Sequence, residues 1–229
     1  MTVFRFPLLS GVSVVSLSLS VLSVLLLQGC ASQPAVPDWQ LSAKSASDRF
    51  VTAYLTGNAR VEALAFDKAR QALSSTGRPD ALARLELLRC ATRVASLVLE
   101  PCAVFELLRA DASAADQAYA DYLAGRATGQ NAGLLPTAQQ RLASAAPTAQ
   151  ASVMQAIDEP LSRLVGAAVL LRTGQASPAA LAQAVETASA QGWRRPLLAW
   201  LGVLALRAEQ AGDMDEAKRL RRRMDVAAP

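Results

Sequence analysis

Apolar residues after position 37 recur at the three- and four-residue intervals of helices, and no segment alternates convincingly between apolar and polar residues as a strand does. Alanine and leucine supply most of the apolar positions, and runs of β-branched residues are nearly absent, which favours helix throughout. The pattern predicts helices at residues 39–56, 58–75, 79–97, 101–109, 113–126, 136–145, 148–157, 160–173, 178–191, 195–211 and 214–226. The expected fold is all-α, with helical hairpins stacked as an irregular repeat-like array or bundle.

Prolines and glycines mark the boundaries of these helices. Prolines lie at or near predicted first turns, where the missing N–H costs nothing, and glycines lie where helices stop; they are Pro79, Pro160, Pro178 and Pro196, and Gly57, Gly77, Gly174, Gly192 and Gly212. The least helical stretch contains Gly125, Gly129 and Gly133 among polar residues, and we interpret 127–135 as a loop. This loop divides an N-terminal helical half, 38–126, from a C-terminal half, 136–229.

The N-terminus has the three parts of an export signal. A single cation, Arg5, precedes an uncharged apolar run over residues 8–27, and the small residues Gly29 and Ala31 follow. The run is also nearly long enough to span a bilayer, so an uncleaved membrane anchor is the alternative. We predict a signal peptide at 1–29 and a short polar tether at 30–37, in which two prolines prevent helix.

The residues that end the apolar run decide between these alternatives. Leu27-Gln28-Gly29-Cys30 resembles the lipobox of bacterial lipoproteins, although Gln28 is a less usual residue at the tolerant position. The resemblance implies cleavage before Cys30, a diacylglycerol on its sulfur and acylation of the new amine, which together hold a protein stably on a membrane. By resemblance to the sorting rule of Gram-negative lipoproteins, Ala31 after the cysteine implies the outer membrane, with the domain facing the periplasm.

Two other cysteines, Cys90 and Cys102, remain once Cys30 is lipidated. An oxidising compartment favours their pairing, and the bridge would join the end of one predicted helix to the start of the next. The alternative is two buried, reduced cysteines that pack as small apolar residues. A redox-active pair is not expected, since the spacing is far from Cys-x-x-Cys and no histidine is present to lower a thiol pKa.

The C-terminal segment Gly212-Asp213-Met214-Asp215-Glu216-Ala217 resembles the turn between the two helices of a tetratricopeptide repeat. The resemblance puts Leu201 and Leu204 at the repeat's large apolar positions, Ala205 at its small position and Pro229 at the proline that ends the unit. An ordinary, well-capped α-hairpin is the alternative.

The residues of this turn also predict its local structure. Asp213 can cap the N–H groups of the following helix while Glu216, three residues on, reaches back to complete a capping box. We expect an antiparallel hairpin of 195–211 and 214–226 that buries Leu201, Leu204 and Ala217 and leaves Arg219, Arg222 and Arg223 exposed.

The composition removes most catalytic arrangements. Histidine is absent, so Ser-His and Cys-His pairs, imidazole metal ligands and imidazole bases are excluded, and none of the three lysines follows a serine at the Ser-x-x-Lys spacing. The adjacent acids Asp158 and Glu159 lie at a predicted helix start, where capping explains them better than glycoside hydrolysis does. We expect no metal, no cofactor and no enzymatic activity. A net charge of +4 is also too mild to predict nucleic-acid binding.

Two groups of residues are candidates for contact with a partner. Lys218, Arg219, Arg221, Arg222 and Arg223 place five cations in the last helix, where they either bind an anionic surface or form a solvated face. Trp193, Arg194 and Arg195, with Trp200, place two large rings near a helix start, where they either pack in the core or form a binding surface.

The resulting hypothesis is a non-enzymatic, outer-membrane-anchored lipoprotein that acts as a helical interaction scaffold or assembly factor for another envelope protein. Its partners would be the membrane, through the lipid on Cys30, and an envelope protein that the sequence does not identify. Two alternatives stay open: a carboxylate-based hydrolase of cell-wall glycans, which needs two acids converging in a cleft, and a carrier of a small apolar ligand, which needs an enclosed cavity.

Overall fold

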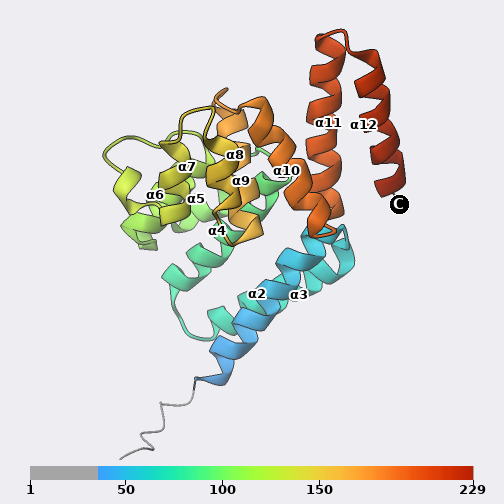
Figure 1. Cartoon of the computed structure of the whole chain (residues 1–229). Coiled ribbons are helices and arrows are strands. Elements are labelled where there is room, and N and C mark those ends of the chain that lie inside the picture. The colour runs from blue at the N-terminus through green and yellow to red at the C-terminus, as the bar shows by residue number, and fades with distance from the viewer. Residues whose placement is uncertain (1–35, 229) are drawn as a thin grey trace, which may run out of the picture. The chain divides into compact units, whose positions relative to one another are not determined.

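The computed structural model describes residues 36–228, and all regular secondary structure in that range is helical (Figure 1). The prediction of an all-α fold is confirmed. The predicted export signal, Cys30, tether residues 31–35 and Pro229 lie outside the described residues. Within 36–228, no helix combines the length and the apolar character needed to cross a membrane.

Each of the eleven predicted helices is present. Their bounds are α2 Asp38–Thr56, α3 Ala59–Ser74, α4 Pro79–Ala95, α5 Ala103–Leu108, α6 Ala114–Leu123, α7 Thr137–Ala143, α8 Gln150–Gln155, α9 Pro160–Arg172, α10 Pro178–Ala190, α11 Arg194–Gln210 and α12 Met214–Ala227. Two short 3₁₀ turns, η1 Arg109–Asp111 and η2 Ala132–Leu134, complete the order. The main differences lie at helix ends: α6 stops before Gly125, and α8 is shorter at both ends than predicted.

Local chemistry accounts for where the helices begin and end. The side chains of Asn58, Ser113 and Ser177 each accept a hydrogen bond from a backbone N–H in the first turn of the helix that follows. The helices α4, α9 and α10 start with proline. At the α2–α3 and α11–α12 turns, Gly57 and Gly212 have φ of +86° and +79°, which glycine adopts without steric cost.

The main core is organised around α9, whose residues 164–170 are all buried. This helix packs against α4 and α10 and also contacts α6, α7 and α8. Figure 1 shows α9 among the helices drawn in green and orange. Gly166 permits the approach of α7, since a Cβ added there would lie 2.3 Å from Cδ2 of Leu142. The described residues from Asp38 onward form one compact unit, in which α4 of the predicted N-terminal half packs on α9 of the C-terminal half.

A second, smaller core lies between α2, α3 and α4. Phe50 and Phe66 meet edge to face, with ring centroids 5.3 Å apart, and Leu85 of α4 packs against them. The guanidinium of Arg89 lies 4.4 Å from the Phe66 ring centroid and covers its face. The α2–α3 hairpin is therefore joined to the main body through α4.

The predicted loop 127–135 contains the 3₁₀ turn η2 and ends at a buried residue, Leu135. The Gln140 side-chain amide donates hydrogen bonds to the carbonyl oxygens of Leu135 and Gly133, at 2.7 and 3.2 Å. The Gln140 side chain of α7 thus holds the end of this segment against the body.

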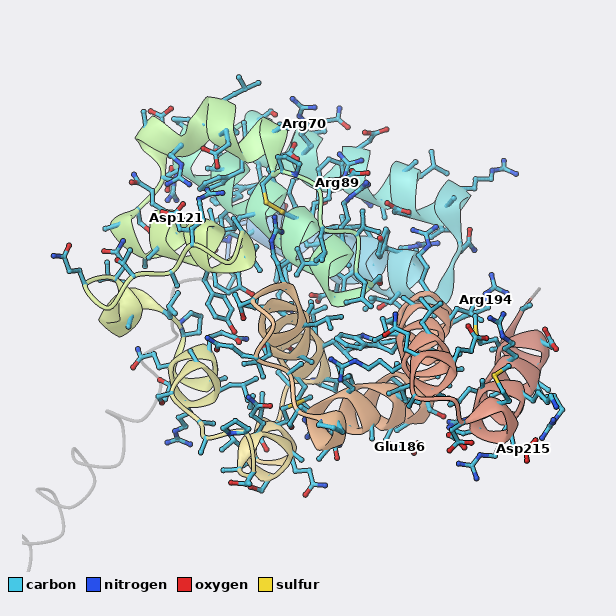
Figure 2. All side chains as sticks on the ribbon, turned by 90° about the horizontal axis from the view of Figure 1, so that it is seen from above. Arg70, Arg89, Asp121, Glu186, Arg194 and Asp215 are labelled. Carbon is cyan, nitrogen blue, oxygen red and sulfur yellow. A yellow bond between two sulfur atoms is a disulfide. The ribbon has the colours of Figure 1, made fainter. Side chains whose placement is uncertain are left out.

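The predicted disulfide is present. Cys90 near the end of α4 is bonded to Cys102 at the start of α5, with Cα atoms 5.7 Å apart (Figure 2). That separation lies within the range in which two cysteines are bridged without backbone movement. The bridge joins the end of one helix to the start of the next, as the cysteine spacing predicts.

Glu86 is a buried acid beside this bridge. The residue is 7% exposed, and its burial raises the pKa of the carboxyl. The positive charges of Arg89 on α4 and Arg70 on α3, both labelled in Figure 2, lower this pKa by a smaller amount. A raised folded-state pKa means that this group stabilises the fold most at low pH and that the contribution is lost as pH rises through the folded pKa.

We therefore expect Glu86→Gln to raise the melting temperature at pH 7.5, with a smaller gain near pH 4, where the carboxyl is largely protonated. Melting curves at both pH values measure the difference, and Asp67→Asn, at an exposed acid of α3, is the control that should change neither. A lower melting temperature for Glu86→Gln at pH 7.5 would mean that attraction to Arg89 and Arg70 exceeds the desolvation cost.

Candidate functional site

The C-terminal hairpin forms largely as predicted. The helices α11 and α12 pack against each other, and the hairpin lies beside the rest of the unit (Figure 1). Leu201 and Ala217 are buried, but the prediction for Leu204 is wrong: it is only half-buried, because it packs at the edge of the main core. The predicted exposure of Arg219, Arg222 and Arg223 is confirmed.

Only half of the predicted capping box is present. The side chain of Asp213 accepts a hydrogen bond from the Glu216 N–H at 3.0 Å. The reciprocal bond is absent, because the Asp213 N–H donates to the carbonyl oxygen of Ala208 in the turn that ends α11. Glu216 instead forms an ion pair with Arg219.

The five cations of α12 are mostly paired with nearby acids. The ion pairs are Lys218–Asp215, Arg219–Glu216, Arg221–Glu209 and Arg223–Glu186. Within the described residues, Arg222 is the cation of this cluster without an ion pair. The local acids therefore offset most of the positive charge, and the cluster attracts an anionic surface less than the sequence suggests.

The residues around the start of α11 make contacts within the protein. Trp193 packs against the main core, and Arg194, labelled in Figure 2, lies against Gly57 at the α2–α3 turn. The guanidinium of Arg195 lies 4.2 Å from the ring centroid of Tyr54 and forms a 3.4 Å ion pair with Glu62. These arginines thus hold α11 against the α2–α3 hairpin.

A groove that the sequence did not predict runs between α2 and α4, with the starts of α6 and α9 at its edge. Its volume is about 840 Å³, and it is open to solvent. One face of α2 and one face of α4 supply most of its lining, which consists of Trp39, Gln40, Ala43, Lys44, Ser47, Asp48, Val51, Thr52, Leu73, Arg78, Ala81, Arg84, Leu85, Leu87, Leu88, Ala91, Asp116, Tyr119, Glu159, Leu161 and Ser162.

The groove has a mainly apolar floor and charged rims. Small residues such as Ala43 and Ala81 leave room beside the larger Val51 and Leu88. On the rims, Lys44 pairs with Asp48 at 2.7 Å and Arg84 pairs with Asp116 at 3.2 Å. An apolar floor between paired charges is suited to an amphipathic occupant more than to a highly charged one.

Tyr119 lines the groove at the α6 end. Its ring stacks with Tyr122, with centroids 6.1 Å apart, and the Tyr122 hydroxyl donates to Oε1 of Gln139. Burial is the larger cause that raises the pKa of the Tyr119 phenol, and the negative charge of Glu159 raises it further. The phenol therefore stays protonated at neutral pH.

A second hollow, of about 510 Å³, lies between α7, α8 and the start of α9. Glu159 and Ser162 line both the groove and this hollow. The start of α9 therefore borders both hollows.

The acids in the groove have structural partners. Glu159 caps α9 by accepting hydrogen bonds from the N–H groups of Leu161 and Ser162, and Asp48 and Asp116 are in ion pairs. Within the described residues, no three potential ligands are grouped to hold a metal ion. The arrangement therefore offers a surface for binding, with its carboxylates engaged in capping and pairing.

Sequence reasoning missed this groove because its walls come from helices far apart in the chain. A weak signal was present in α2, where Trp39, Ala43, Ser47 and Val51 recur every four residues on one face. Whether another helix covers such a face depends on tertiary packing.

No protein-family model matches the chain, and neither does any curated protein or solved structure with which it was compared. Its function is therefore inferred from the geometry of the described residues and from the motifs in the sequence.

Proposed function

We propose that this chain is an outer-membrane lipoprotein, anchored through Cys30, whose helical domain acts as a scaffold in the periplasm by binding a helical segment of another envelope protein. The observation that supports this function is the open groove between α2 and α4. The lipobox resemblance at residues 27–30 supports the location and the anchor.

The dimensions of the groove suit a helix. Its lining extends along α2 from Trp39 to Thr52 and along α4 from Arg78 to Ala91, each a stretch of roughly 20 Å at the helical rise. Two long helical walls that flank an apolar floor are the usual receptor for an amphipathic helix. The same openness to solvent favours a polypeptide over a small apolar ligand, because carriers of such ligands enclose them.

The anchor is tested by replacing Cys30 with alanine and labelling cells with an alkyne palmitate. We expect the label to be lost and the protein to leave the membrane fraction or to accumulate as an uncleaved precursor. The matched control is Cys90→Ala/Cys102→Ala, which removes the other two cysteines and should keep the label. A wild-type protein that never takes up palmitate would contradict the anchor.

The scaffold function is tested by photo-crosslinking in intact envelopes. A p-benzoylphenylalanine at Ser47, in the groove, should give one discrete adduct with another protein, whereas the same residue at Lys68, on exposed α3, should not. Leu88→Glu places a charge on the groove floor and should abolish the adduct, whereas Leu64→Glu, at an exposed leucine of α3, should leave it unchanged. Equal crosslinking from both positions, or an adduct that survives Leu88→Glu, would contradict the proposal.

A further inference from the structure

The place where the chain enters the domain specifies the partner of the groove further. We infer, on the basis of the proposed function and its lipid on Cys30, that the end of the groove at the start of α2 faces the outer membrane. The occupant is then the juxtamembrane amphipathic helix of another protein that is anchored in the same membrane. Three features support this partner: the point of chain entry, the short distance to Cys30 and the apolar residues exposed at that end.

The chain enters the domain at one end of the groove. Trp39 and Gln40, in the first turn of α2, line the groove, as do Leu73 near the end of α3 and Arg78 directly before α4. The start of α2 lies beside the end of α3, because the two helices pack as an antiparallel hairpin (Figure 1). These four residues therefore mark one end of the groove, which we call the entry end.

The sequence limits how far the entry end can lie from the lipid. Asp38, the first residue of α2, follows Cys30 by eight residues, and a fully extended chain of that length spans at most about 29 Å. The α2 wall of the groove adds roughly 20 Å at the helical rise. The whole groove thus stays within about 50 Å of the membrane surface, where the segments next to the anchors of other membrane proteins also lie.

Apolar side chains are exposed at the entry end. Val36 is 52% exposed and Leu41 is 56% exposed, and Trp39 between them is half-buried. Tryptophan and aliphatic side chains close to a lipid anchor favour the bilayer interface, where the apolar groups leave water. The entry end is therefore the part of the domain best suited to face the membrane, and the groove opens beside it.

The rims of the groove add little long-range attraction for a partner, because their cations are paired within the protein. The ion pairs are Lys44–Asp48, Arg78–Asp80 and Arg84–Asp116. Paired charges give little electrostatic steering, and an open groove covers only one face of a helix, so we expect a weak intrinsic affinity. Confinement of both proteins to one membrane offsets this weakness, because it raises the effective concentration of the partner segment without any further contact.

Moving the protein to the other membrane tests this inference. By resemblance to the sorting rule of Gram-negative lipoproteins, aspartate after the lipidated cysteine keeps a lipoprotein in the inner membrane. Ala31→Asp therefore leaves the domain, the lipid and the compartment unchanged but takes the groove away from the outer membrane. The adduct from p-benzoylphenylalanine at Ser47 should fall at least about tenfold, because the partner segment is out of reach. Ala31→Ser, which introduces no aspartate, should keep the adduct.

Membrane fractionation checks the location of each variant, and mass spectrometry of the wild-type adduct provides a second readout. The crosslinked peptide should lie in a helical segment next to a lipid anchor or a membrane-spanning segment of the partner. An equal adduct from relocated Ala31→Asp protein, or a partner without a membrane anchor, would overturn the inference while leaving the helix-binding groove intact. If the wild-type domain gives no adduct at Ser47, the proposed function itself fails.

The orientation of the groove is measured on purified lipidated protein in nanodiscs that contain nitroxide-labelled lipid. Leu41→Cys supplies one free thiol for a fluorophore, since Cys30 carries the lipid and Cys90 is bonded to Cys102. The labelled lipid should quench the fluorophore at this position. It should quench the same fluorophore much less at Val226→Cys, an 89% exposed position near the end of α12. Equal quenching at the two positions would overturn the membrane-facing orientation of the entry end.

Discussion

Replacing Trp200 with alanine is expected to lower the free energy of unfolding by about 3–5 kcal/mol, the range for large aromatic side chains removed from a core. Trp200 is fully buried in α11, and its indole N–H donates to the carbonyl oxygen of Ala95 at the end of α4, at 3.1 Å. The substitution would leave a cavity and an unpaired carbonyl between two helices more than a hundred residues apart in the chain.

Two control variants separate the contributions of Trp200. Trp200→Phe keeps most of the ring volume and should cost less, because it loses mainly the hydrogen bond. Trp193→Ala, at a half-buried tryptophan, should also cost less than Trp200→Ala. Urea unfolding followed by far-ultraviolet circular dichroism measures all three. A loss below about 1 kcal/mol for Trp200→Ala would contradict tight packing between α11 and α4.

Removing the disulfide should have the next largest effect. Cys90→Ala/Cys102→Ala is expected to lower the free energy of unfolding by about 3 kcal/mol, because the bridge closes a short loop and restricts the unfolded chain. The loss should be concentrated at α5, a helix of six residues that depends on the bridge and on Phe105 for its attachment to α4. Hydrogen exchange should therefore quicken in α5 more than in α9.

Wild-type protein with and without reductant is the matched comparison for this variant. In oxidised protein both thiols should resist alkylation until reductant is added, and the reduced protein should unfold at the same urea concentration as the double variant. Equal stability of the oxidised and reduced wild-type proteins would contradict a stabilising role for the bridge.

The sequence by itself determined which segments are helical and in what order, and it placed most helix boundaries to within a few residues. The signals that start and stop them, such as the cap Asn58, the first-turn Pro160 and the positive φ of Gly212, act within a few residues and need no partner from elsewhere in the chain. The pairing of Cys90 with Cys102 was predictable for a related reason, since helix ends close in sequence lie close in space.

Tertiary structure alone decided which surfaces remained open and which charges were paired. Arg195 was a candidate for contact with a partner, but Tyr54 and Glu62, from helices more than a hundred residues away, contact it instead. The arginines of α12 form one basic cluster in the sequence, but in the structure acids of α10, α11 and α12 lie beside them. The groove was not predictable because an apolar helix face looks the same in sequence whether another helix covers it or solvent does, and only the packing of α2 against α4 left this one uncovered.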